Sequence, residues 1–175
     1  MFPRRDRPGD PIRMHERTDL DAPGAGLKHP MMQRLLSYWR GKCRDGRLPG
    51  RQDIDPLDFP DLLPHITMFD VVQVGGETRF RIRLLGTSNV QLMGADCTGD
   101  FVDARLGPED AARILTPYRL VVEQRRPDFV RGSLVTPGRE HVHYERLLLP
   151  LAADGRTVDM LLALFLPADP PPTDD

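Results

Sequence analysis

Hydrophobic residues recur along this chain with two different periods, and the change between them separates predicted helices from predicted strands. After Pro30, apolar residues recur at intervals of three and four: Met32, Leu35, Leu36, Trp39 and Cys43. This spacing places them on one face of a helix, and a proline suits the first helical position because its missing N–H would have no helical partner there. The pattern predicts a helix over residues 30–45, ended by the turn Asp45-Gly46.

From Ile66 onward the period becomes two, which is typical of strands. The runs ITMFDVVQV and ETRFRIRLLG are joined by Gly75-Gly76, and this pair of glycines predicts a β-hairpin. In the second run an apolar set alternates with an arginine set: Phe80, Ile82 and Leu84, against Arg79, Arg81 and Arg83. Since neighbouring side chains of a strand point to opposite faces, we expect the apolar set to face a core and the arginines to face outward.

A second helical pattern covers residues 107–126, with Pro117 inside it, so we expect a kink or a break near Leu115–Thr116. Three strand-like runs follow: PDFVRGSLVT, HVHYERLLLPL and TVDMLLALFL. Two strands before a helical middle and three after it predict an α+β fold. We expect a five-stranded antiparallel sheet with helices on one face, a flanking N-terminal helix, and a small apolar cavity between the layers.

The two ends of the chain differ from its middle in composition. Residues 1–29 are rich in Pro, Gly, Arg and Asp, and residues 168–175 are acidic and proline-rich, so we expect a disordered leader, one domain over residues 30–167, and a disordered tail. A net charge of -2 and a pI near 6.2 argue against nucleic acid or a membrane surface as partner. With two cysteines and no apolar run of membrane-spanning length, we expect a cytoplasmic protein.

The local sequence is more specific than the order of elements. Four stretches stand out: YWRGKCRDGRLPGRQDIDPLDFPDLLPHI (38–66), FRIRLLGT (80–87), GADCTGDFVD (94–103) and YERLLLPLAADG (144–155). Together they resemble a family of small alphaproteobacterial PAS-domain proteins, over about residues 30–167, and the element order is that of the PAS fold. The resemblance implies a sensory or interaction module, and it implies no particular ligand.

Cys97 is the first candidate for chemistry. The stretch G-A-D-C has the spacing found in flavin-binding LOV domains, whose cysteine adds to photoexcited flavin. The residues that follow, T-G-D-F, lack the arginine and the glutamine that hold the flavin phosphate and ring in those domains. We therefore interpret Cys97 as a turn or half-buried residue and expect no photochemistry.

Other polar patterns give weaker signals. His141, His143 and Glu145 alternate on one predicted strand, which could share a metal ion, but no third His or Cys lies near them, so we expect a solvated strand face. Haem-binding PAS domains carry their proximal histidine on the long helix, and residues 107–126 contain none. The spacing R-x-x-x-R of phosphate clamps occurs three times by chance, one of them at Arg79–Arg83. We find no catalytic motif.

The expected cavity has a predicted lining. Its wall candidates are Phe80, Ile82, Leu84, Tyr118, Val122, Tyr144 and Leu162, with Asn89 as a polar contact. The same residues would also suit a fully packed core, so the sequence leaves both readings open.

The stripe on the first helix predicts a homodimer. The outer face of the arginine-bearing strand is a poor surface for burying Met32, Leu35, Leu36, Trp39 and Cys43, and an exposed stripe of that size is unusual on a monomer. The alternative is that the helix folds back onto its own sheet.

The leading functional hypothesis is a non-catalytic PAS module that signals through protein–protein contact with an unidentified partner. A small apolar ligand would gate it. The alternative is a cofactor sensor that holds haem, flavin or a metal ion in the cavity.

Overall fold

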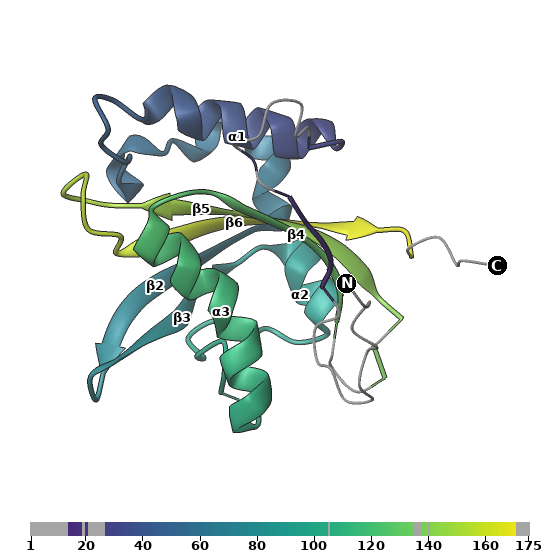
Figure 1. Ribbon diagram of the computed structural model, residues 1–175. Helices are drawn as coiled ribbons and strands as arrows, with labels where there is room; N and C mark the ends of the chain where they lie inside the picture. The colour runs from purple at the N-terminus through teal and green to yellow at the C-terminus, as the bar shows by residue number, and fades with distance from the viewer. Residues whose placement is uncertain are drawn as a thin grey trace, which may run out of the picture.

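The computed structural model of the chain describes residues 14–18 (backbone only), 20, 27–104, 106–134, 138–139 and 141–170. Figure 1 shows the arrangement of its elements. The strands are β1 (Met14–Thr18), β2 (Ile66–Val74), β3 (Glu77–Leu85), β4 (Asp128–Ser133), β5 (His143–Leu151) and β6 (Met160–Ala168). The α-helices are α1 (Pro30–Lys42), α2 (Thr87–Met93) and α3 (Pro108–Gln124), and three short 3-10 helices, η1 (Arg51–Asp53), η2 (Pro56–Asp58) and η3 (Pro60–His65), lie between α1 and β2.

The strands form one antiparallel sheet in the order β1-β4-β5-β6-β2-β3. Strands β2 to β6 make up the five-stranded antiparallel sheet that the sequence predicts. The predicted hairpin is also confirmed, because β2 and β3 pair directly across Gly75 and Gly76, whose φ angles of 59° and 83° are left-handed. None of the helices in the described part of the chain combines the length and apolarity needed to cross a membrane.

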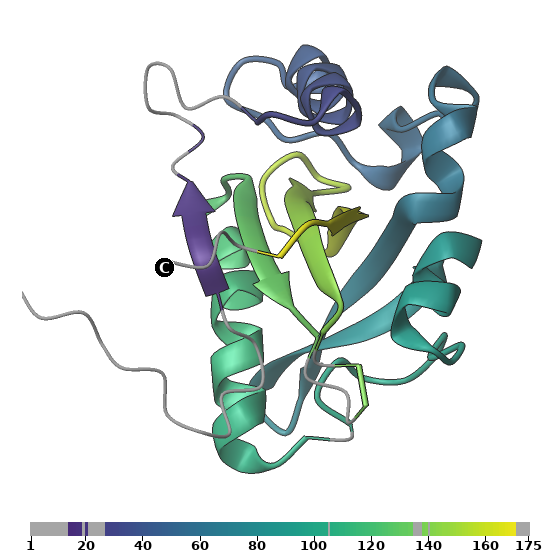
Figure 2. The same ribbon diagram turned by 90° about the vertical axis from the view of Figure 1, so that its right-hand side faces the viewer.

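Strand β1 corrects the prediction of a leader that is disordered throughout. Met14–Thr18 pairs antiparallel with β4 and adds a sixth strand at the sheet edge, as Figure 2 shows. A strand edge presents unpaired N–H and C=O groups, so a segment can join it through its backbone without an apolar pattern of its own. Leu20 and Leu27 are also buried. The other leader residues up to 26, and residues 171–175, lie outside the described residues.

The sheet is covered on both faces. In Figure 1, α1 lies on one face, and α2 and α3 lie on the opposite face. One apolar cluster joins α1 to alternate residues of β5 and β6, such as Leu147, Leu149 and Leu164. A second cluster joins α3 to the intervening residues, such as Leu148 and Leu161. The central strands are therefore apolar on both sides, which explains why their sequences show no alternation.

The stripe on α1 packs against its own sheet, so these side chains are not available as a dimer surface. Met32, Leu35, Leu36 and Trp39 are buried within the single chain, and Cys43, just past the helix end, is half-buried against the same cluster. Helical spacing correctly identified the buried face, but its partner is the sheet of the same chain. The homodimer itself stays a prediction and would need another surface.

Helix α3 continues through Pro117, where the sequence predicts a kink or a break. It runs unbroken from Pro108 to Gln124. Next to the proline, the hydroxyl of Thr116 donates to the carbonyl oxygen of Ala112 at 2.8 Å. Packing of Ile114, Leu115 and Tyr118 into the second cluster holds the helix on the sheet and keeps it continuous past the proline, so the predicted break is wrong.

Candidate functional site

A cavity of about 440 Å³ lies between the sheet and the helices on the α3 side. Its floor comes from strands β2 to β6, and its walls come from α2, α3 and residues 94–104 and 106 between them. Most of the lining is apolar, for example Phe69, Leu92, Ile114 and Phe165. A space of this size falls within the range of small-molecule sites in proteins, which runs from roughly 300 to 1,000 Å³.

Four of the predicted wall residues line this cavity: Ile82, Asn89, Tyr118 and Tyr144. Phe80 is buried behind the wall, with its ring centroid 5.2 Å from that of Tyr118. Val122 lines a separate surface hollow near Glu77 and Arg119.

Leu84 does not face the cavity, and a β-bulge explains why. Met68 pairs with Leu84, but the next residue, Phe69, pairs with Ile82, so Arg83 is an extra residue in β3. An extra residue reverses the inward and outward alternation beyond it. Leu85 therefore takes the wall position, and Leu84 is left 44% exposed.

Leu162 lies on the opposite face of the sheet, in the cluster under α1. Its neighbours Leu161 and Ala163 face the α3 side instead. Because β6 is buried on both faces, the sequence MLLALFL carries no polar residue to show which set points to which layer.

Asn89 holds α2 against the start of β2. Its side-chain nitrogen donates to the carbonyl oxygen of His65 at 2.8 Å and to the hydroxyl of Thr67 at 2.9 Å. Both donors of the amide are thus engaged at a buried position. Asn89 is a wall residue with a positioning role in addition to the polar contact that the sequence suggested.

The sequence interpretation missed a buried charge in the cavity wall. The side chain of Arg146 in β5 is 2% exposed, and its Nη2 lies 3.3 Å from a carboxylate oxygen of Asp128, which is 3% exposed. The guanidinium also lies over the ring of Tyr118, 4.9 Å from its centroid. A signal was present, because Tyr144, Arg146 and Leu148 share one face of the predicted strand, so an arginine lies among apolar side chains there.

The protonation states in this wall follow from burial. Burial raises the pKa of Tyr144 to about 12, and burial also raises the pKa of Tyr118. Burial by itself would lower the pKa of Arg146, but the phenols of Tyr118 and Tyr144 and the carboxylate of Asp128 outweigh it, and the pKa is raised. At neutral pH the wall therefore holds a guanidinium cation and two protonated phenols.

Arg139 lies at the edge of the cavity, across the end of α2. Its Nη1 donates to the carbonyl oxygens of Gln91 and Leu92, both at 3.0 Å. Gly94 ends α2 with a φ of 81°, and a Cβ atom at this position would lie 2.6 Å from Nε of Arg139. Glycine at residue 94 thus meets two needs, a left-handed backbone and close approach of the arginine.

Cys97 lies in the turn that follows α2, and its side chain also lines the cavity. The turn is stabilised by Asp96, whose carboxylate accepts from the backbone N–H of Thr98 at 2.9 Å. Among the described lining residues there is one cysteine and no histidine.

The alternating residues His141, His143 and Glu145 do not form the solvated strand face that the sequence predicts. Glu145 is buried and forms an ion pair with Arg131 on the neighbouring strand, on the sheet face opposite Arg146. His143 is half-buried and His141 is exposed. Within the described residues, no three His, Cys, Asp or Glu side chains come together as a metal-binding group.

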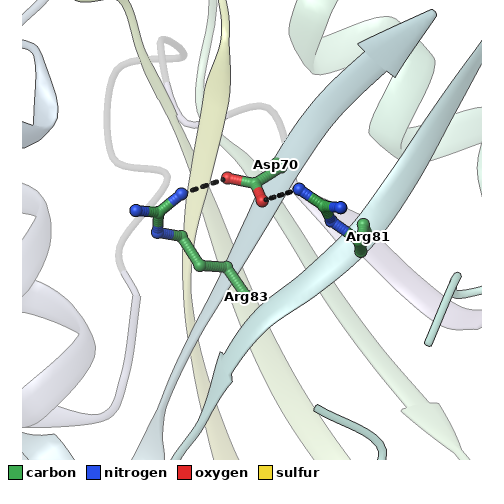
Figure 3. Close-up of polar contacts among 3 residues, drawn as sticks. All are labelled: Asp70, Arg81 and Arg83. Carbon is green, nitrogen blue, oxygen red and sulfur yellow. Dashed lines mark hydrogen bonds and ion pairs between the residues drawn. The ribbon is translucent and has the colours of Figure 1, made fainter. Parts of the chain in front are cut away.

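The arginines of β3 face outward as predicted, and each has an acidic partner. Asp70 of β2 lies between Arg81 and Arg83 and accepts from them at 3.0 Å and 3.1 Å (Figure 3). Arg79 pairs with Asp103 at 3.0 Å and lies over the ring of Phe101. The spacing from Arg79 to Arg83 therefore serves ion pairs within the chain, and it does not present two free guanidinium groups to a phosphate.

Comparison with known proteins agrees with this architecture. The family model described as PAS domain matches residues 27–166, which includes the sheet from β2 to β5, most of β6, and all three α-helices. No curated protein matches the chain. Since the match covers well over half of the chain and the antiparallel sheet with its helices is the one that the PAS resemblance implied, the chain belongs to the PAS domain family.

Proposed function

We propose that this PAS domain is a non-catalytic sensory module gated by a small apolar ligand in the cavity between the sheet and α3. Membership of the PAS family supports a sensory or interaction role. The observation that carries the ligand is the cavity of about 440 Å³ beside the buried apolar cluster under α3. A mostly apolar cavity of this size with a few polar groups in its wall is typical of a small-molecule site.

A contact at the end of α3 offers a route for the signal. Arg125 follows the last turn of α3, and its Nη2 lies 3.3 Å from the carbonyl oxygen of Gly46 and 3.2 Å from that of Gly155. Gly46 belongs to the turn that follows α1, and Gly155 belongs to the turn between β5 and β6. A ligand that shifts α3 would thereby shift the α1 side of the sheet, where an output partner could respond.

The haem, flavin or metal alternative has less support. Haem iron or a metal ion would need coordinating side chains from the lining, and the described lining residues offer one thiol, one carboxylate and two phenols but no imidazole. Among the described residues, no three His, Cys, Asp or Glu side chains come together there. An apolar ligand needs no such donor.

A neutral apolar probe tests the proposal. We expect N-phenyl-1-naphthylamine to gain fluorescence with the wild-type protein and to lose that gain with Ile114→Trp, which fills the cavity from α3. The matched control is Leu57→Trp, because Leu57 is 80% exposed and does not line the cavity. Fluorescence that persists in a folded Ile114→Trp variant, or no gain with wild type, would contradict ligand gating.

A further inference from the structure

Arg146 is an incompletely paired cation inside the cavity wall. A guanidinium has five N–H donors arranged as a planar fork. The contact with Asp128 uses Nη2 at 3.3 Å, longer than the usual charge-assisted distance of about 2.7–2.9 Å. Nε of Arg146 is fully buried and has no hydrogen-bond partner in the described part of the chain. Buried polar groups in native proteins are rarely left in this state.

The packing around Arg146 compensates for its burial only in part. The ring of Tyr118 faces the guanidinium at 4.9 Å, which gives a cation–π contact. Asp128 balances the charge through Nη2, and Arg146 is one of the residues that line the cavity, so the guanidinium keeps donors that Asp128 does not use. An oxygen anion placed in the cavity would supply the missing acceptors, and a carboxylate matches the fork in shape.

The rest of the lining favours an acid with an apolar body. Its charged members are Arg139, Arg146 and Asp100, with Asp128 outside the lining as the partner of Arg146. Tyr144 lies two residues before Arg146 on the same face of β5, and its protonated phenol is a further donor. Toward α3 and the segment that follows α2, most of the wall is apolar, as at Ile114, Val102 and Leu106, and Asp100 is the charged exception.

From these contacts we infer that the cavity takes a small monocarboxylic acid with an aromatic or aliphatic body, whose carboxylate pairs with Arg146. The inference rests on the proposed function and refines its ligand, which keeps an apolar body but carries one ionised head group. The carboxylate lies against the sheet at Arg146 and Tyr144, and the apolar body lies between α3 and the α2 wall.

Three probes with one body and different heads test this: 4-phenylbutyrate, 4-phenylbutan-1-ol and 4-phenylbutylamine. By calorimetry with the wild-type protein at neutral pH, we expect the acid to bind about tenfold or more tightly than the alcohol, because a hydrogen bond to a charged group is stronger than a neutral one. The amine should bind most weakly, because it meets the guanidinium as a like charge.

A double variant removes the guanidinium together with the carboxylate that balances it. Arg146→Met with Asp128→Leu exchanges the whole ion pair for apolar side chains, and such exchanges are often tolerated. We expect it to keep the affinity for the alcohol and to lose the preference for the acid. The matched control is Arg131→Met with Glu145→Leu, which removes the partly buried ion pair between β4 and β5 from the opposite face and should keep the preference.

Each result decides a separate point. If the wild-type protein binds the acid and the alcohol equally well, the inference of an acid ligand is wrong, but ligand gating is unaffected. The same conclusion holds if the folded double variant still binds the acid more tightly than the alcohol. No binding of any of the three overturns the inference, while the neutral naphthylamine probe tests the cavity independently. If the double variant does not fold, Arg146→Lys is used instead, because it keeps a cation but loses the planar fork. The affinity of this variant for the acid should fall toward its affinity for the alcohol. An unchanged preference in that variant contradicts the inference.

Discussion

Trp39 of α1 donates its indole N–H to the backbone carbonyl of Pro150 in β5, at 2.9 Å. Both residues are buried, so this bond joins the N-terminal helix to the centre of its own sheet. The helix is thereby a layer of the domain, and its apolar stripe is part of the core.

Substitution of Trp39 tests whether its side chain packs in the core of the monomer or at a dimer interface. Trp39→Phe keeps an aromatic ring but leaves the Pro150 carbonyl without its donor, so we expect the free energy of unfolding to fall by about 1–3 kcal/mol in urea denaturation. The mass in solution, measured by light scattering, should not change. If the variant keeps its stability but its mass in solution is half that of the wild-type protein, Trp39 would belong to a dimer interface.

We expect Asn89 to stabilise the fold through its two N–H donors more than through its size. Asn89→Asp keeps the shape but cannot donate to His65 and Thr67, so we expect a loss of about 2–4 kcal/mol of stability. Gln91→Glu makes the same chemical change at an exposed position of α2 and should stay within about 0.5 kcal/mol of wild type. Similar effects of the two variants would show that Asn89 does not hold α2 in place.

Gly94 should control access to the cavity through Arg139. A Cβ at Gly94 meets the guanidinium, whereas one at Gly76, which has nearly the same φ, meets nothing. Gly94→Ala and Gly76→Ala should each lose about 1–2 kcal/mol from the left-handed backbone. Only Gly94→Ala should also speed the reaction of Cys97 with a thiol reagent, measured in a Cys43→Ala background, because it displaces Arg139 from the cavity edge. Equal rates in both variants would argue against that role for Arg139.

The raised pKa of Tyr144 predicts a loss of stability in alkali. Its pKa is about 12 in the folded protein, against 10.0 for an exposed phenol, so between these values the folded state binds more protons than the unfolded state. The contribution is complete below pH 10 and is lost as pH rises toward 12. We expect the unfolding free energy to fall less steeply above pH 10 for Tyr144→Phe than for wild type. If the unfolding free energies of the variant and the wild-type protein fall in parallel with pH, burial of this phenol does not contribute to the loss of stability in alkali.

More of the fold than of the candidate site could be predicted from the sequence. Periodicity identified the buried stripe of α1 and the hairpin at Gly75-Gly76 because each depends on local spacing. It could not say what covers Trp39, since a helical stripe shows that a face is buried and not which surface buries it. It also could not find β1, which joins the sheet through backbone pairing with β4.

The candidate site depends on features that spacing does not record. One extra residue at Arg83 moves Leu84 out of the wall and Leu85 into it. The two-sided burial of β6 hides the orientation of Leu162. Arg146 could have been found, because a lone arginine within an apolar strand must either reach solvent or find a partner in the core.

The most direct test of ligand gating is a titration of the amide NMR spectrum of the full chain with N-phenyl-1-naphthylamine. We expect the largest shifts to fall on cavity-lining residues such as Ile114 and Tyr144, and smaller shifts to reach Gly46 through Arg125. The same titration of Ile114→Trp should leave the spectrum unchanged. Shifts confined to exposed apolar residues such as Leu57 and Leu84, or no shifts in the wild-type protein, would contradict the claim that the cavity is a ligand site.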